Sequence, residues 1–153
     1  MTGMLASVSN LNEALQVLNI NVDIIDLKQP SEGALGALEP ALINTIVTAI
    51  GRQCTVSATV GDLPMQPEVV AQAVQGLAAT GVDYIKIGFF PGGDWSGTVN
   101  ALTDLAASGL ALIAVLFADT QPDFSILAPL KEAGFKGVML DTMDKRKGSL
   151  TQI

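Results

Sequence analysis

The chain is organised around Val22–Lys28, VDIIDLK, where an apolar strand ends on a carboxylate and an amine. Side chains alternate between the two faces of an extended strand, so Asp26 and Lys28 share one face. Burying such groups at the end of an apolar strand is unfavourable unless they are paired or used in chemistry. The face that carries them is therefore predicted to line a functional cavity.

A second stretch, Val82–Gly88, VDYIKIG, repeats this design with Lys86 near its end. By the same alternation Lys86 lies on the face opposite to the apolar side chains of Ile85 and Ile87. Two lysines at the ends of two strands, aimed at one cavity, are the strongest chemical signal in the chain.

Short apolar strands alternate with amphipathic segments along the whole sequence, and a strand recurs about every 30 residues. This alternation predicts a parallel sheet with right-handed helical crossovers. Strands are expected at Met4–Val8, Val22–Leu27, Thr55–Val60, Tyr84–Gly88, Leu110–Phe117 and Gly137–Leu140. Helices are expected at Leu11–Leu18, Pro40–Ile50, Pro67–Ala79, Thr98–Ala107 and Phe124–Ala133.

A (β/α)8 TIM-type barrel and an open doubly wound sheet both fit this pattern. Polar residues at several different strand ends favour the barrel, whose active site is built from that rim. They are Asp26, Lys28, Asp62, Lys86, Asp119 and Asp141. A doubly wound sheet would instead gather its chemistry at one switch point. The fold class expected is thus an α/β barrel, truncated after about six strands.

Residues 1–153 are expected to form this single barrel domain without the last two β/α units. Six strands of an unclosed barrel leave two free edges, which favour pairing with other strands. Either the chain is a fragment of a longer protein or it closes its sheet with another copy. We therefore expect a homo-oligomer.

The composition excludes several classes of function. The net charge of −7 argues against a nucleic-acid partner, and no apolar run approaches the roughly 18 residues of a membrane span. A single cysteine, Cys54, fits a reducing cytoplasm and is interpreted as a small core residue. With no histidine in the chain, acid–base work falls to Lys, Asp, Glu or Tyr, and we expect neither a metal nor a cofactor.

Lysine chemistry then becomes the leading hypothesis. Burial and a second nearby ammonium make a lysine amine a better nucleophile near neutral pH, and the free amine can attack a carbonyl to form a Schiff base. The alternative is that Lys28 and Lys86 form salt bridges with Asp26 and Asp141. Those two carboxylates would position a lysine or shuttle a proton, or else cap a helix.

Other polar residues support less specific hypotheses. Asp62 and Asp119 are interpreted as loop or capping residues. Backbone N–H groups of two glycine-rich loops could bind a phosphate, as could a short basic cluster. These stretches are Pro30–Gly36, which contains Ser31, Gly33 and Gly36, then Pro91–Gly97 with Trp95, and Lys145–Lys147.

The motifs together resemble the (5-formylfuran-3-yl)methyl phosphate synthases of methanofuran biosynthesis. The resemblance rests on VDIIDLKQPSEGALGA, VSATVGDLP, VDYIKIG, the FAD of LFADTQPDF, and VMLDTMDKRKG, in the right order over nearly the whole chain. Members of that family run on through two further strands.

The resemblance implies a barrel enzyme that condenses two molecules of glyceraldehyde 3-phosphate, a small phosphorylated carbonyl substrate, for one-carbon metabolism. It implies that Lys28 is the Schiff-base lysine and Lys86 the proton acceptor, with Asp26, Asp141 and Lys145 completing the polar cluster. It also implies that the chain as given has little or no activity alone. Two alternatives are another lysine-dependent class I aldolase acting on a sugar phosphate and a non-catalytic fragment that acts by associating with another chain.

Overall fold

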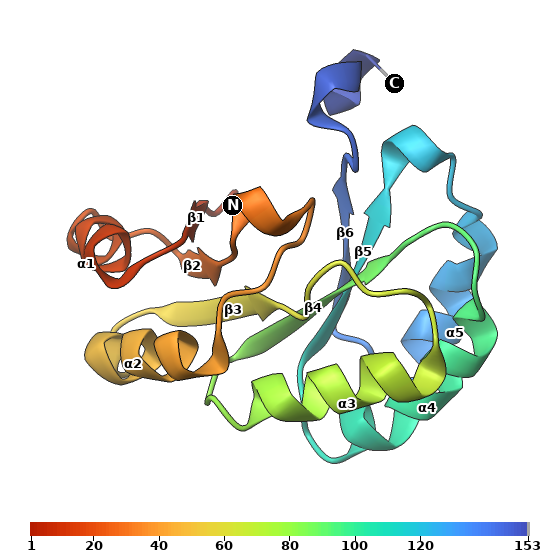
Figure 1. The fold of residues 1–153 in the computed structure, drawn as a ribbon, viewed down its shortest axis with the longest axis horizontal. Coiled ribbons are helices and arrows are strands. Elements are labelled where there is room, and N and C mark those ends of the chain that lie inside the picture. Colours follow the sequence, from red (N-terminus) through yellow and green to blue (C-terminus); the bar gives the residue numbers. More distant parts are fainter. Residues whose placement is uncertain (153) are drawn as a thin grey trace.

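The computed structural model describes residues 1–152, which form one sheet of six parallel strands covered by five helices (Figure 1). The strands are β1 (Leu5–Val8), β2 (Ile24–Leu27), β3 (Thr55–Thr59), β4 (Tyr84–Phe89), β5 (Leu112–Phe117) and β6 (Gly137–Asp141). The helices are α1 (Leu11–Asn19), α2 (Pro40–Ile50), α3 (Pro67–Ala78), α4 (Trp95–Ala107) and α5 (Leu127–Glu132).

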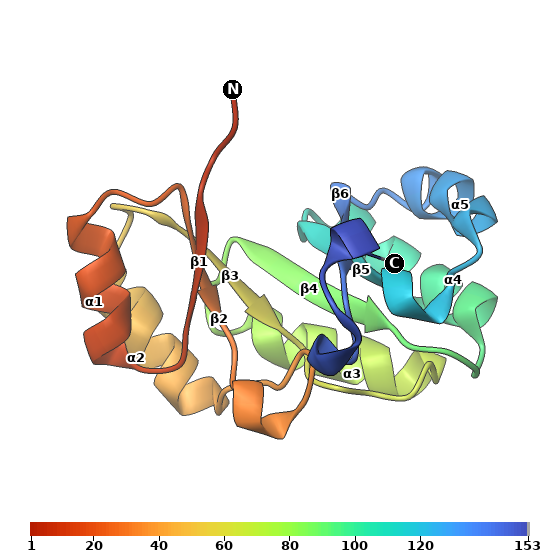
Figure 2. The same ribbon diagram turned by 90° about the horizontal axis from the view of Figure 1, so that it is seen from above.

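The strands lie side by side in the order of the chain, from β1 to β6. The sheet is curved, and the helices lie along its outer side (Figures 1 and 2). This arrangement is that of a half-barrel, because a doubly wound sheet reverses its strand order and carries helices on both faces. The sequence prediction of a barrel-type sheet over a doubly wound one is confirmed for these six strands.

The main core lies between the outer face of the sheet and the helices. Ile25 and Leu27 point into it from β2 and are completely buried, as the alternation in VDIIDLK predicts. Ile43 and Ile46 of α2 pack against the same core, since they lie three residues apart on one face of the helix. Burying one face of β2 in this core leaves Asp26 on the inner face.

Two helices begin differently from the sequence prediction. Helix α4 starts at Trp95 rather than Thr98, because the carboxylate of Asp94 caps it by accepting the N–H of Gly97 at 2.7 Å. The predicted helix Phe124–Ala133 splits into a short 3₁₀ turn, Phe124–Ile126, followed by α5. Among residues 1–152, no helix is both long enough and apolar enough to cross a membrane.

Both edges of the sheet are free of a neighbouring strand within the described chain. On the outer face of β6, Val138 and Leu140 are 42% and 47% exposed, whereas the outward residues of the central strands are buried. The two edges are where a further strand can pair.

Candidate active site

An ion pair between two strands forms the buried centre of the candidate site. Nζ of Lys86, on β4, lies 2.7 Å from Oδ2 of Asp26, on β2, and the two side chains are 4% and 1% exposed. They reach each other on the inner face across β3, which lies between their strands. The sequence placed both residues on this face but made Asp26 the same-face partner of Lys28; the structure instead pairs Asp26 with Lys86.

Two serines hold the carboxylate of Asp26 from either side. Ser7 on β1 and Ser57 on β3 are the residues in register with Asp26 on the neighbouring strands. Ser7 Oγ donates to Oδ2 of Asp26 at 2.9 Å, and Ser57 Oγ donates to Oδ1 at 2.7 Å. With Lys86, these donors satisfy both carboxylate oxygens. Sequence reasoning did not identify either serine. A polar residue at an inward-facing position of each short strand could have indicated them as partners of Asp26.

Lys28 lies just beyond the end of β2 and is half-buried. Its Nζ donates to the carbonyl oxygen of Ala34 at 3.2 Å, in the loop that follows the strand. None of the salt bridges among residues 1–152 involves Lys28. Of the two strand-end lysines, Lys86 is thus held by a carboxylate and Lys28 by a neutral carbonyl.

A second ion pair joins Asp141, at the end of β6, to Lys145, four residues further on. Here the lysine side chain is 55% exposed and the carboxylate 25% exposed, and Lys145 also donates to Oγ1 of Thr142 at 3.1 Å. The adjacent Arg146 pairs with Asp144 and lowers the pKa of that carboxyl to about 2. The basic cluster is therefore partly neutralised by its own carboxylates.

The loop that contains Ser31, Gly33 and Gly36 is tightly packed, and two of its glycines leave no room for a side chain. Gly33 has a φ of 127°, and a side chain there would strike the carboxylate of Asp62. A side chain at Gly36 would strike the carbonyl oxygen of Gln29. Close approach accounts for both glycines, and the predicted role of Ser31, Gly33 and Gly36 in phosphate binding stays a prediction.

Asp62 and Asp119 are loop residues, as the sequence predicts. Asp62 follows β3 and accepts two backbone N–H groups from the loop after β2. Asp119 follows β5 and accepts two from the loop after β6. The N–H groups of Met143 and Asp144 account for its lowered pKa, with that of Asp144 contributing most.

A small apolar cluster lies on the inner face beside these polar groups. It consists of the buried residues Leu35, Val115 and Phe117. The ring of Phe90 packs on that of Phe117, with ring centroids 4.6 Å apart. Gly88, two residues beyond Lys86, leaves the room that this cluster fills. The inner face therefore joins a polar region to an apolar wall.

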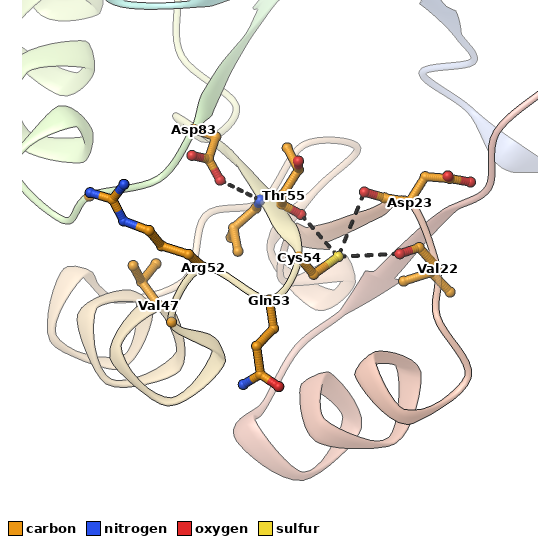
Figure 3. Close-up of a pocket in the computed structure, with 11 residues that line it drawn as sticks. Val22, Asp23, Val47, Arg52, Gln53, Cys54, Thr55 and Asp83 are labelled. Carbon is orange, nitrogen blue, oxygen red and sulfur yellow. Dashed lines mark hydrogen bonds between the residues drawn. The ribbon is translucent and has the colours of Figure 1, made fainter.

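Two hollows are candidates for binding. One, of about 220 Å³, lies on the inner face and is lined by Ser57, Tyr84 and Lys86, among others. The other, of about 760 Å³, lies where β2, β3 and β4 begin, between residues such as Arg52, Cys54 and Asp83 (Figure 3). One of its carboxylates, that of Asp83, is used by the backbone, since it accepts the N–H of Val56 at 2.8 Å. We place the site on the inner face, where the first hollow is lined by Lys86 of the buried ion pair and by Ser57, one of the serines that donate to Asp26.

Cys54 lines the second hollow and directly precedes β3. It is half-buried and packs against the main core, and its thiol lies 3.3 Å from the carbonyl oxygen of Val22. The interpretation of Cys54 as a small packing residue agrees with this position.

Comparison with solved structures agrees with the half-barrel. Dihydrodipicolinate synthase from Agrobacterium tumefaciens superposes with a TM-score of 0.70 at 14% identity, over 90% of this chain and 54% of that one. A 2,3-dimethylmalate lyase superposes with a TM-score of 0.66 at 16% identity, over 92% of this chain and 59% of that one. At such low identity these similarities describe the fold alone.

Sequence comparison is more specific. A putative (5-formylfuran-3-yl)methyl phosphate synthase from Methylorubrum extorquens is 39% identical over 98% of this chain and 61% of its own length. The synthase of Methanobrevibacter smithii is 33% identical over 93% of this chain and 65% of its own. The chain thus spans less than two thirds of the length of these relatives. Because the family model described as 4-HFC-P synthase matches residues 4–153, the chain belongs to the 4-HFC-P synthase family.

Proposed function

We propose that this chain carries the lysine centre of an enzyme that condenses two molecules of glyceraldehyde 3-phosphate to (5-formylfuran-3-yl)methyl phosphate through a Schiff base. The buried Asp26–Lys86 pair, with Lys28 close to the same strand end, is the observation that carries this proposal. Family membership supports the substrate, and the geometry supports the division of work between the two lysines.

Lys28 is the better nucleophile of the two on geometric grounds. For Lys86 to attack a carbonyl, its amine must leave a buried carboxylate, and breaking such a pair is strongly unfavourable. For Lys28 to attack, its amine gives up one hydrogen bond to the carbonyl oxygen of Ala34, which is a loss of about 1 kcal/mol. We therefore assign the Schiff base to Lys28.

The Asp26–Lys86 pair would then exchange protons with the bound substrate. Attack of the Lys28 amine on the aldehyde forms a carbinolamine, which loses water to give an imine. The imine acidifies the neighbouring C–H, and a proton acceptor beside it permits loss of the phosphate as an anion. Over the whole reaction two triose phosphates lose one phosphate and two waters, which balances with the furan aldehyde phosphate.

The remaining predicted residues have supporting roles in this proposal. Asp141 and Lys145 supply a second pair of opposite charges at the end of β6, next to the free edge of the sheet. Lys145 is exposed enough to bind a substrate phosphate, as a point charge. The loop that contains Ser31, Gly33 and Gly36 is the second candidate for that phosphate, through N–H groups other than those of Ala34 and Leu35, which Asp62 accepts.

We also propose that turnover requires two further β/α units beside β1 and β6. Both of these strands have a free edge in the described chain, and the relatives are longer than this chain. Comparison of turnover between this chain and the full-length Methylorubrum extorquens relative tests this point. Equal turnover would contradict it.

Borohydride trapping tests the Schiff base directly. The chain is incubated with glyceraldehyde 3-phosphate, reduced, digested and mapped by mass spectrometry. We expect a reduced adduct on Lys28, its loss in Lys28→Met, and its retention in the control Lys131→Met, which removes an exposed lysine of helix α5. Trapping requires only the first chemical step, so it remains measurable where turnover is weak.

The same experiment separates the alternatives. An adduct that forms with other carbonyl substrates and never with glyceraldehyde 3-phosphate would favour a different class I aldolase. Absence of any adduct, combined with a stable oligomer, would favour a non-catalytic chain that acts by association.

A further inference from the structure

Two rim carboxylates outside the ion pairs make the same kind of contact. The first is Asp62, three residues past the end of β3. Its Oδ2 accepts the N–H of Ala34 at 3.0 Å and its Oδ1 accepts the N–H of Leu35 at 2.7 Å. The carbonyl of Ala34 in turn accepts the amine of Lys28. One residue, Ala34, therefore connects Asp62 to the lysine proposed as nucleophile.

The loop gives further signs that it is fitted to this carboxylate. Gly33 adopts a left-handed conformation and leaves no room for a side chain against Asp62. Leu35, the next residue held, is completely buried in the inner apolar cluster. Asp62 holds the backbone of the loop on one side, and the buried side chain of Leu35 anchors the loop on the other. The loop therefore has a defined position relative to Lys28.

The second carboxylate is Asp119, two residues past the end of β5. Its Oδ1 accepts the N–H of Met143 at 2.8 Å and its Oδ2 that of Asp144 at 2.9 Å. The residue that follows is Lys145, which forms the second ion pair. Asp119 thus holds the loop after β6 in the way that Asp62 holds the loop after β2.

We infer that Asp62 and Asp119 are positioning residues, each of which braces the lysine-bearing loop of a neighbouring strand through two backbone N–H groups. Neither carboxylate contacts a lysine, so each acts through the loop backbone. A carboxylate that accepts two N–H groups makes two charge-assisted hydrogen bonds, which fix the direction of the loop as well as its distance. The inference for Asp62 rests on the proposed role of Lys28.

The test compares Asp62→Ala and Asp119→Ala with Asp123→Ala as the matched control. Asp123 is an exposed loop carboxylate that accepts only the N–H of Ser125, two residues away. Hydrogen exchange is measured for the peptides 29–38 and 142–148. Asp62→Ala should speed exchange in 29–38 alone, Asp119→Ala in 142–148 alone, and Asp123→Ala in neither.

A chemical readout follows the position of Lys28. In Asp62→Ala the rate of the borohydride-trapped adduct with glyceraldehyde 3-phosphate should fall by about 10–100-fold, the range for a misplaced reacting group. Asp62→Asn keeps one acceptor oxygen and should recover part of the rate, whereas the control Asp123→Ala should leave it unchanged. A general loss of stability would instead slow all the variants together and speed exchange in both peptides.

Reductive methylation of Lys28 with formaldehyde separates this inference from the proposed function. If wild type forms no adduct with glyceraldehyde 3-phosphate, the proposed function fails, and methylation then reports the bracing. Methylation of Lys28 should be about fivefold faster in Asp62→Ala than in wild type, which is the factor expected for loss of the one hydrogen bond from Lys28 to Ala34. Unchanged exchange in 29–38 together with an unchanged methylation rate in Asp62→Ala would overturn the inference.

Discussion

Removing the amine of Lys86 should destabilise the fold far more than removing the amine of Lys145. In Lys86→Met the carboxylate of Asp26 keeps its two serine donors and loses its only counter-ion among residues 1–152. Because that carboxylate is 1% exposed, water cannot replace the ammonium. Breaking a buried pair in this way lowers the free energy of unfolding by about 3–5 kcal/mol.

The second ion pair supplies the matched control. Lys145→Met makes the same chemical change at a lysine that is 55% exposed, opposite a carboxylate that is 25% exposed. Solvent screens such a pair, so the expected loss is about 0–1 kcal/mol. The comparison keeps the residue types constant and changes only their burial.

Urea unfolding followed by circular dichroism measures both variants, with the free energy taken from the midpoint and slope. The single variant Asp26→Asn and the double variant Asp26→Asn with Lys86→Met complete the cycle, since an amide in place of the carboxylate removes the unpaired charge. The double variant should be more stable than the sum of the single changes predicts, by about 0.5–3 kcal/mol. If Lys86→Met costs no more than Lys145→Met, the buried pair does not hold the site together.

Two further substitutions test the surroundings of the pair, and a titration tests the contact that Asp119 makes with the loop after β6. Ser57→Ala leaves one oxygen of the buried Asp26 without its donor, so urea unfolding should show a loss of about 1–3 kcal/mol. Gly88→Ala would place a methyl 2.6 Å from the ring of Phe90 and should lose about 1–3 kcal/mol in the same assay. Its control, Gly76→Ala, has open space in α3 and should gain about 0.5–1 kcal/mol. The lowered pKa of Asp119 predicts that the bracing is present above pH 3.8, its ordinary value, and is lost as the pH falls through the lower folded value. The backbone amide shift of Met143 should therefore titrate with a midpoint below 3.8, and a midpoint at or above that value would contradict the bracing.

Sequence reasoning predicted the strands, their order and the inward face, because alternation along a strand is a local property. The position of Asp26 opposite Ile25 and Leu27 follows from three consecutive letters and is confirmed by their burial. The partner of Asp26 did not follow, since it depends on the distance between strands that are about 60 residues apart in the chain. The sequence hypothesis made Asp26 the partner of Lys28 on the same strand face, whereas the sheet joins Asp26 to Lys86.

The serines and the loop contacts were harder to predict for the same reason. Ser7 and Ser57 become meaningful only when the register places them beside Asp26 on either side. Asp62 was recognised as a loop residue, but its target, the backbone after β2, carries no side-chain signal in the sequence. Backbone partners are invisible to motif reasoning, and here they connect a rim carboxylate to a candidate nucleophile.

The two ion pairs also divide the site into parts that depend differently on the rest of a barrel. Asp26 and Lys86 lie in the middle of the sheet and are buried by residues 1–152 alone. Asp141 and Lys145 lie at the free edge beyond β5, where one side of β6 has no neighbour among the described strands. A further strand paired to β6 would remove water from the second pair and leave the first almost unchanged. The step that should gain from added β/α units is therefore the one that uses Lys145, whereas Schiff-base formation at Lys28 should already occur in this chain.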